Sequence, residues 1–276
     1  MRIDAHQHFW NFDRVPYIWP TKDEEPIFRS IEPPELAGIL KEVHIDKTIL
    51  VQADNSYEDT LYMLEIAEKY NWVAGVVGWV PLDKPDETAI RLEKFLENPY
   101  FKGVRHLIHN EKDVNWLIQP QVIEGLNVLQ ANDVPFDVVA VLPEHLKLIP
   151  ILSEKLPNLR MVIDHLGKPP IASAQFEPWQ ELIKQAASNP NVYAKISGLN
   201  TAASPDWNAE DIQPYIDIAF TLFGADRLMF GSDWPVLNLA GDYKQVLDSV
   251  EIAMTERTDK EYQAVFDKTA TKFYQL

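Results

Sequence analysis

The chain of 276 residues contains no cysteine. This absence excludes disulfide bonds, thiolate nucleophiles and zinc sites built on cysteine. Any metal ion would need histidine and carboxylate ligands, and the chain supplies 7 histidines and 42 aspartates and glutamates. The absence also fits a reducing compartment, so we expect a cytoplasmic protein.

Positive charge and long apolar runs are also scarce. With 25 basic against 42 acidic residues, the formal net charge is -17. Such a charge repels phosphate backbones and anionic membrane surfaces, so neither nucleic acid nor a membrane is an expected partner. No apolar run approaches the ~20 residues of a membrane span, and no basic segment followed by a hydrophobic one occurs at the N-terminus, so we expect neither a membrane span nor a leader.

Eight apolar stretches, each followed by a helical pattern, alternate along the chain. Eight such units in about 250 residues are typical of a (β/α)8 TIM barrel. The stretches are apolar nearly throughout, as strands buried on both faces must be. The predicted strands are Ile3–Trp10, Ile45–Ala53, Trp72–Leu82, Phe101–His109, Pro135–Val141, Leu159–Gly167, Val192–Gly198 and Arg227–Pro235.

We predict one α/β barrel domain over residues 1–276, because no Gly/Ser linker or shift in composition interrupts the series. An open, doubly wound sheet is the alternative. It would normally bind a nucleotide on a Gly-rich first turn, and no G-x-G-x-x-G follows a strand here. The segment Asn11–Pro34 lacks a strand or helix pattern, so we expect a functional loop there.

The first predicted strand ends in two histidines one residue apart, His6 and His8. Because side chains alternate along a strand, both point the same way, with Asp4 expected on the same face. Two imidazoles that converge from one strand end can bind a divalent metal or hold an oxyanion.

Titratable residues gather at the ends of other predicted strands as well. The active site of a barrel lies at the C-terminal ends of its strands. Five of the seven histidines fall at such ends, whereas strand interiors consist largely of Val, Ile, Leu, Ala and Gly. Together with His6 and His8, the polar and aromatic residues at these ends are Arg105, His106, His109, Asp164, His165, Lys195, Ser197, Ser232, Asp233 and Trp234.

Five motifs in chain order carry a family resemblance. They are Asp4-Ala5-His6-Gln7-His8, Lys102-Gly103-Val104-Arg105-His106, Ile163-Asp164-His165-Leu166-Gly167-Lys168-Pro169, Lys195-Ile196-Ser197-Gly198 and Gly231-Ser232-Asp233-Trp234-Pro235. Together they resemble the amidohydrolase superfamily, amidohydrolase family 2, whose barrel is of the metal-dependent-hydrolase type. More narrowly, the chain is similar to the sugar-lactonase branch, the L-fuconolactonase and L-rhamnonolactonase-like enzymes, and that branch also resembles the pyrone-dicarboxylate lactonase.

The resemblance implies a hydrolase that opens a small sugar-acid (aldono)lactone by water attack on the lactone carbonyl. His6, His8, His165 and Asp233 would surround the water and the carbonyl. A carboxylate among imidazoles and apolar walls suits Asp233 as the base that takes a proton from the water. His165 would polarise the carbonyl oxygen or bind a metal.

Four further residues are expected to bind substrate. Arg105 would hold ring oxygens or a substrate carboxylate. His106 lies on the opposite strand face, so only one of the pair enters the lumen, and we expect Arg105 there with His106 in support. Trp19 and Trp234 would stack on a sugar ring or cover the site.

The resemblance also bears on metal content. Binuclear members of the superfamily use a modified lysine on the fourth strand and a histidine on the fifth. In this chain Arg105 lies in the region of the fourth strand where those members have the lysine. Residues 136–141, the fifth strand, contain no histidine, so at most one metal is expected. One zinc on His6, His8 and Asp233 is the metal-bound alternative. In the metal-free alternative, which we favour, protonated imidazoles and Arg105 stabilise the oxyanion.

Two other functions stay open at this point. One is a metal-dependent decarboxylase of an unsaturated carboxylic acid on the same fold, and the other is a non-catalytic binding protein. The expected partner is a small sugar lactone, and the sequence leaves a homo-oligomer open.

Overall fold

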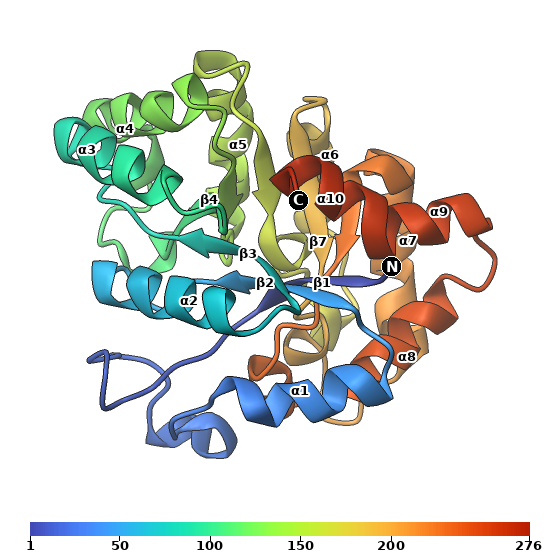
Figure 1. Cartoon of the computed structure of the whole chain (residues 1–276). Coiled ribbons are helices and arrows are strands. Elements are labelled where there is room, and N and C mark those ends of the chain that lie inside the picture. The colour runs from blue at the N-terminus through green and yellow to red at the C-terminus, as the bar shows by residue number, and fades with distance from the viewer.

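The computed structural model describes all 276 residues and contains eight parallel strands paired in chain order. The predicted TIM barrel is therefore confirmed (Figure 1). The strands are β1 (Ile3–Gln7), β2 (Lys47–Val51), β3 (Val73–Gly78), β4 (Phe101–His106), β5 (Phe136–Val138), β6 (Met161–Ile163), β7 (Val192–Ile196) and β8 (Leu228–Phe230).

The sheet closes between β1 and the segment that follows β8. The amide of His8 donates to the carbonyl of Trp234 over 2.7 Å, and the amide of Asp233 donates to the carbonyl of His6 over 2.8 Å. These two bonds bring the first and last site motifs of the sequence side by side, although more than 220 residues separate them.

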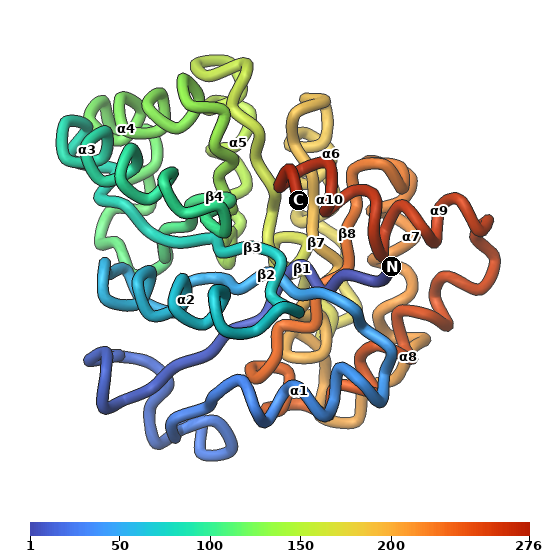
Figure 2. Tube along the Cα trace, viewed as in Figure 1, coloured from blue at the N-terminus to red at the C-terminus, as the bar shows by residue number.

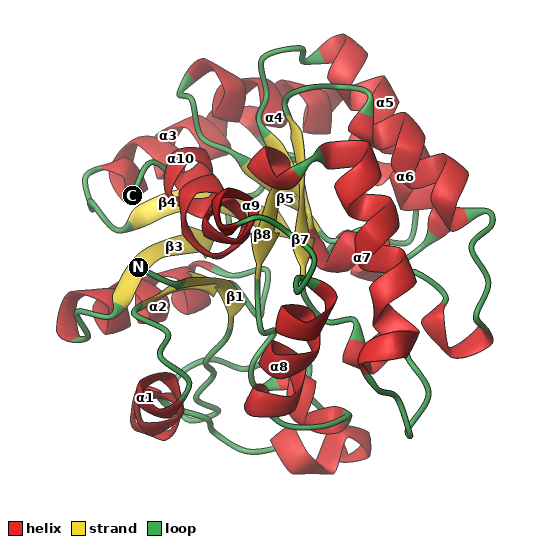
Figure 3. Ribbon diagram, turned by 90° about the vertical axis from the view of Figure 1, so that its right-hand side faces the viewer, coloured by secondary structure: helices red, strands yellow, loops and turns green.

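The helices surround the strands (Figures 1 to 3). Four of them begin with proline, at Pro33, Pro85, Pro120 and Pro143, where the missing amide hydrogen of proline costs nothing. No helix is long and apolar enough to cross a bilayer. Their bounds are α1 (Pro33–Glu42), α2 (Tyr57–Lys69), α3 (Pro85–Leu96), α4 (Pro120–Ala131), α5 (Pro143–Lys155), α6 (Trp179–Ala187), α7 (Ala209–Phe223), α8 (Tyr243–Ala253), α9 (Asp259–Gln263) and α10 (Thr269–Tyr274).

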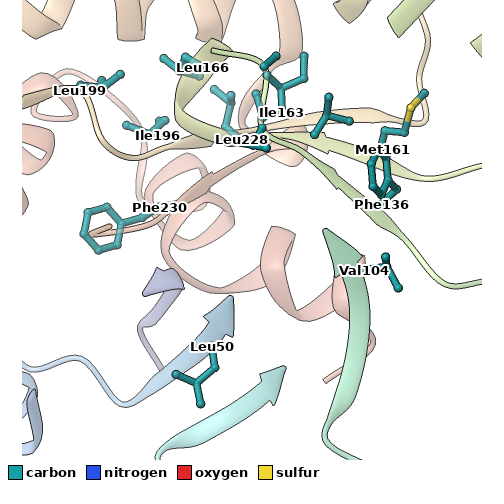
Figure 4. Close-up of a cluster of buried hydrophobic side chains, with 14 of the residues drawn as sticks. Leu50, Val104, Phe136, Met161, Ile163, Leu166, Ile196, Leu199, Leu228 and Phe230 are labelled. Carbon is teal, nitrogen blue, oxygen red and sulfur yellow. The ribbon is translucent and has the colours of Figure 1, made fainter. Parts of the chain in front are cut away.

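Buried apolar side chains of the strands join those of the helices and loops in one large cluster. Figure 4 shows part of this cluster, in which side chains from neighbouring strands lie close together. Burial of each such side chain stabilises the fold by about 1.5–3 kcal/mol before the loss of chain entropy. The side chains labelled there are Leu50, Val104, Phe136, Met161, Ile163, Leu166, Ile196, Leu199, Leu228 and Phe230.

The helix α10 covers the N-terminal mouth of the barrel. Lys102, near the start of β4, donates to the carbonyl of Gln275 over 3.0 Å, and Arg160, just before β6, donates to the carbonyl of Phe273. The Tyr274 hydroxyl reaches Asp137 of β5 at 2.8 Å. With this end closed, the opposite mouth is the one left for a substrate.

Several strands are shorter than the sequence pattern predicts. β6 ends at Ile163 and β8 ends at Phe230, because the chain then turns out of the sheet. His165 and Asp233 have positive φ angles of 55° and 62°, which a strand does not allow. These site residues therefore lie on the turns that follow the strands rather than on the strands themselves.

The expected position of Asp4 is wrong. The pairing register of β1 shifts between Asp4 and Gln7, so the regular alternation of faces breaks between these two residues. Ile3 and Ala5 pack with apolar side chains of the barrel interior, whereas Asp4 accepts a hydrogen bond over 2.8 Å from Tyr243 of α8. Asp4 therefore lies on the side of the strand away from His6.

Candidate active site

A cavity of about 500 Å³ opens where the chain leaves the C-terminal ends of the strands. The polar side chains of its wall are His8, Arg105, His109, Asn110, His165, Lys168 and Asp233. Apolar side chains of Ala53, Leu107, Val139, Val141 and Val236 form the rest of the wall, with Ile18 and Trp19 of the first loop among its lining. A largely apolar cavity with a few convergent polar groups is the usual form of a small-molecule site.

His6, His8 and Asp233 form a tight triangle at this cavity. Nε2 of His6 lies 3.1 Å from Nε2 of His8, and Oδ1 of Asp233 lies 3.6 Å and 3.3 Å from these two nitrogens. His6 is fully buried beneath the cavity, whereas His8 and Asp233 reach its wall. The structure thus brings together the three residues that the sequence proposes as metal ligands.

His165 completes the cluster from the turn after β6. Its Nδ1 lies 2.9 Å from the hydroxyl of Ser197 and 4.0 Å from Oδ2 of Asp233. Gly198 permits this approach: a Cβ there would lie 2.7 Å from Nδ1 of His165 and 2.9 Å from Oδ2 of Asp233. Its φ of 57° also disfavours any other residue.

A fully buried lysine, Lys195 of β7, supports the triangle from below. Its Nζ lies 2.5 Å from Oδ2 of Asp137, 3.1 Å from Oδ1 of Asp164 and 3.1 Å from Nδ1 of His6. Arg105 pairs with the other oxygen of Asp164 over 3.2 Å. The two buried cations thus face two buried carboxylates, which is the condition under which charges are tolerated in a core.

The hydrogen bonds of this cluster fix where the protons lie. An ammonium group only donates, so Lys195 uses the lone pair of Nδ1 in His6, and neutral His6 then carries its proton on Nε2. Nδ1 of His8 lies 2.7 Å from the carbonyl of Val51, which only accepts, so the lone pair of His8 is on Nε2. A continuous relay follows: Lys195 donates to His6, His6 to His8, and His8 to Val51.

The imidazoles are neutral and Asp233 is ionised near pH 7. Burial lowers the pKa of His6, His8 and His165, that of His165 to about 4. Burial alone would raise the pKa of Asp233, but the nearby histidines, His165 first, outweigh it and hold that pKa below its ordinary value. The site therefore presents a carboxylate anion among neutral histidines, not the protonated imidazoles expected for the metal-free alternative.

The four residues expected to bind substrate fall into two groups. Arg105 and Trp19 line the cavity. His106 does not, because Trp79 donates to its Nδ1 over 3.0 Å and Glu111 lies 2.8 Å from its Nε2.

Trp234 also lies behind the cavity wall. It is 3% exposed, and its ring centroid lies 5.5 Å from that of Phe9. Its backbone carbonyl, which accepts from His8, connects β8 to β1.

Sequence reasoning assigned no role to the buried layer beneath the triangle. Lys195 and Asp164 lie at the ends of predicted strands, whereas Asp137 lies inside the predicted strand Pro135–Val141. A single carboxylate inside an apolar strand is itself a signal, because a buried charge needs a partner. Its partner Lys195 lies two strands away, a distance that one sequence does not reveal.

The triangle fits one zinc ion. Zinc at about 2.0–2.1 Å from tetrahedral ligands separates those ligand atoms by about 3.3 Å. The observed separations of 3.1, 3.3 and 3.6 Å agree with this value, and His165 brings a further nitrogen within 4.8 Å of the atoms of His6 and Asp233. Metal binding would move the proton of His6 to Nδ1, which lies 3.3 Å from Oδ1 of Asp164.

Comparison with known proteins shows what the chain is similar to. Two L-fucono-1,5-lactonases are similar to the chain: one from Burkholderia ambifaria is 38% identical over 88% of this chain and 83% of its own. The other, from Burkholderia multivorans, is 33% identical over 100% of this chain and 96% of its own.

Solved structures of an amidohydrolase from Burkholderia multivorans superpose closely. The form with bound HEPES has a TM-score of 0.93 at 32% identity, and the form with bound zinc has a TM-score of 0.89 at 31% identity; each comparison covers 100% of this chain and 99% of the other. The amidohydrolase family model (Amidohydro_2) matches residues 3–276. This chain therefore belongs to the amidohydrolase family.

Proposed function

We propose that the protein is a lactonase, a carboxylic ester hydrolase that opens a small aldonolactone. The observation that carries the proposal is the ionised carboxylate of Asp233 at the cavity, in contact with His8 and 4.0 Å from His165. The two L-fucono-1,5-lactonases, each more than 30% identical over most of the chain, support the same reaction.

In the proposed reaction, a water molecule beside Asp233 attacks the lactone carbonyl carbon. As the new C–O bond forms, the water proton moves to the carboxylate of Asp233. The lowered pKa makes Asp233 a weak base but keeps it ionised, so its contribution comes from being held next to the water.

The remaining polar groups act on the lactone itself. His165 donates a hydrogen bond to the carbonyl oxygen, with Ser197 donating to its Nδ1 so that the proton of neutral His165 is on Nε2. Arg105 adds positive charge to the same region. Collapse of the tetrahedral intermediate breaks the ring C–O bond, and the proton on Asp233 passes to the ring oxygen. The new carboxyl group gives its remaining proton to the solvent, and the hydroxy acid leaves as its carboxylate.

We propose L-fucono-1,5-lactone as the first substrate to test. The names of the two relatives support it, and so does the cavity. A deoxy sugar carries a methyl group, which the apolar wall of Leu107, Val139 and Val236 accommodates without leaving a hydroxyl unpaired. The indole of Trp19 offers a flat surface for a sugar ring.

A single zinc is compatible with this proposal. His6, His8 and Asp233 would hold it, and when bound it would act as a Lewis acid toward an oxygen of the water or the lactone. The hydrogen-bond relay already satisfies both imidazoles without a metal, so we propose that turnover does not depend on it.

The test is a panel of aldonolactones, namely L-fucono-1,5-lactone, L-rhamnono-1,4-lactone, D-glucono-1,5-lactone and D-galactono-1,4-lactone, assayed for acid release with a pH indicator. Each is measured with and without a chelator and against the uncatalysed rate. The proposal requires rapid acid release from at least one lactone and no release of carbon dioxide from unsaturated carboxylic acids. Carbon dioxide release without lactone hydrolysis would identify a decarboxylase instead.

A further inference from the structure

Lys168 is the one cation of the cavity wall that the reaction described above does not use. It follows His165 by three residues and closes the turn after β6, with a left-handed φ of 52°. Its backbone amide donates to the carbonyl of His165 over 2.9 Å, so the two residues belong to one compact turn. Its side chain lines the same cavity as His165 and Asp233.

Lys168 forms no close ion pair with a carboxylate, and Asp233 acts on its charge only from a longer distance. Arg105 is paired with Asp164 at 3.2 Å, and Lys195 with Asp137 at 2.5 Å. Lys168 instead contacts two neutral oxygens: Nζ lies 2.8 Å from Oγ1 of Thr201 and 3.4 Å from the carbonyl oxygen of Gly198.

The same contacts leave one hydrogen of Lys168 free. An ammonium group has three hydrogens, and Thr201 and Gly198 accept two of them. The hydroxyl of Thr201 donates to Gly198 over 3.1 Å, which leaves its lone pairs directed to other donors such as Lys168. The amine is thus held in place from one side, with a donor left for a ligand.

Hydrolysis of a lactone creates negative charge where the substrate had none. The oxygen of the tetrahedral intermediate carries a full charge, and the product is a carboxylate. Neutral imidazoles offer hydrogen bonds but no positive charge to such a group. A cation at the cavity wall without a carboxylate partner is complementary to the product and to the transition state, and not to the neutral substrate.

We propose that Lys168 is a further catalytic residue, which binds the developing oxyanion and then the carboxylate of the ring-opened product. This role rests on the proposed lactonase function. Burial lowers the pKa of Lys168 against the opposing effect of Asp233, and an anion bound beside the amine would stabilise its charge further.

The experiment compares the wild-type protein with Lys168→Met and Lys168→Arg. Hydrolysis of L-fucono-1,5-lactone gives kcat and KM, and calorimetric titration with sodium L-fuconate gives the affinity for the product anion. Lys168→Met is expected to lower kcat by about 10–100-fold and to weaken fuconate binding by about tenfold. The KM for the neutral lactone stays nearly unchanged, and Lys168→Arg recovers much of both losses.

Controls separate the role of Lys168 from a general loss of structure. Lys184→Met removes an exposed lysine of α6, and its kinetics should match those of the wild-type protein. If Lys168→Met does not fold, Thr201→Val provides a second variant, because it removes an acceptor of Lys168 and leaves the amine in place.

The two proposals fail separately. If the wild-type protein hydrolyses the lactone and Lys168→Met matches it in kcat and in fuconate affinity, the role of Lys168 is overturned and the lactonase stands. If no lactone is hydrolysed, the lactonase proposal is overturned. The fuconate titration then decides on Lys168 alone. If the wild-type protein binds fuconate and Lys168→Met does not, the anion site at Lys168 is upheld. If the two proteins bind fuconate equally, or neither binds it, the anion site is overturned.

Discussion

Nε2 of His6 lies 3.1 Å from Nε2 of His8, so two histidine nitrogens share one hydrogen bond at the centre of the site. One of them must donate and the other accept. Lys195 on the far side of His6 and the carbonyl of Val51 on the far side of His8 decide the direction. The pair is therefore a satisfied structure without a metal, although its spacing also fits a zinc ligand pair.

Metal removal is expected to leave most of the lactonase activity. The relay from Lys195 to Val51 satisfies His6 and His8 without an ion, and Asp233 is ionised without one. The measurement is lactone hydrolysis after dialysis against a chelator, with residual metal determined by elemental analysis. Activity that disappears on dialysis and returns with one equivalent of zinc would contradict a metal-independent reaction.

Zinc binding itself is expected to involve His8. Its Nε2 lone pair lies 3.3 Å from Asp233, so His8→Ala should weaken zinc binding in a competition assay with a chromophoric chelator. His145→Ala is a matched control, because that histidine lies in α5 and caps the amide of Leu142. Equal affinity in the His8 variant and the wild-type protein would place the ion elsewhere.

Replacement of Lys195 by methionine is expected to destabilise the fold strongly. The substitution leaves Asp137 and Asp164 buried without their shared cation, and breaking a buried pair in this way typically costs about 3–5 kcal/mol. Urea unfolding measures the loss. Adding Asp137→Asn to the same protein removes one orphaned charge and should restore part of the stability, whereas no recovery would show that the pair does not act as a unit.

The pH profile is expected to show two acid limbs. His165, with its pKa lowered to about 4, becomes protonated only near that pH, and kcat/KM should then collapse because a cation forms beside Asp233. Burial raises the pKa of Asp4 to about 6, and Asp4 accepts hydrogen bonds from the amide and the hydroxyl of Ser232, the neighbour of Asp233. As the pH falls through about 6, protonation weakens these bonds, and kcat/KM should drop to a lower plateau.

A variant of Asp4 tests the acid limb near pH 6 separately. Asp4→Asn imitates the protonated form, so at pH 7 this variant should lie on the lower plateau, about tenfold below the wild-type protein. It should also lack the limb near pH 6 and keep the limb near pH 4. A wild-type profile with one limb near 6.5 would instead indicate a histidine with an ordinary pKa.

Gly198→Ala is expected to disable the site. The added Cβ would meet His165 and Asp233 at less than 3 Å, and the φ of 57° adds strain. We expect a large loss of kcat with modest loss of stability. Gly38→Ala is the matched control: its Cβ would meet nothing within 4 Å in the middle of α1, so this variant should gain about 0.5–1 kcal/mol and keep its activity.

Much of the fold was readable in the sequence because each strand of the barrel is apolar and each is followed by a helix pattern. The sequence placed His6, His8, His165, Asp233 and Arg105 at strand ends, and the structure brings them together. The barrel rule succeeds because parallel strands all end at the same mouth.

What the sequence could not show depends on irregular backbone and on partners distant in the chain. The register shift in β1 moves Asp4 to the other face, and strict alternation misses it. His106 adjoins Arg105 in the sequence but is held by Trp79 and Glu111, residues from other segments. Contacts of this kind depend on the closed barrel, so local patterns do not encode them.

The most direct test of the lactonase account is the rate of lactone hydrolysis by Asp233→Asn. The amide keeps the shape of the carboxylate but cannot take a proton from water, so kcat should fall by about 10²–10⁴-fold while the thermal midpoint and the KM stay close to wild type. Measured on L-fucono-1,5-lactone, or on the best substrate of the panel, such a loss supports Asp233 as the base. Wild-type turnover by this variant would contradict the account.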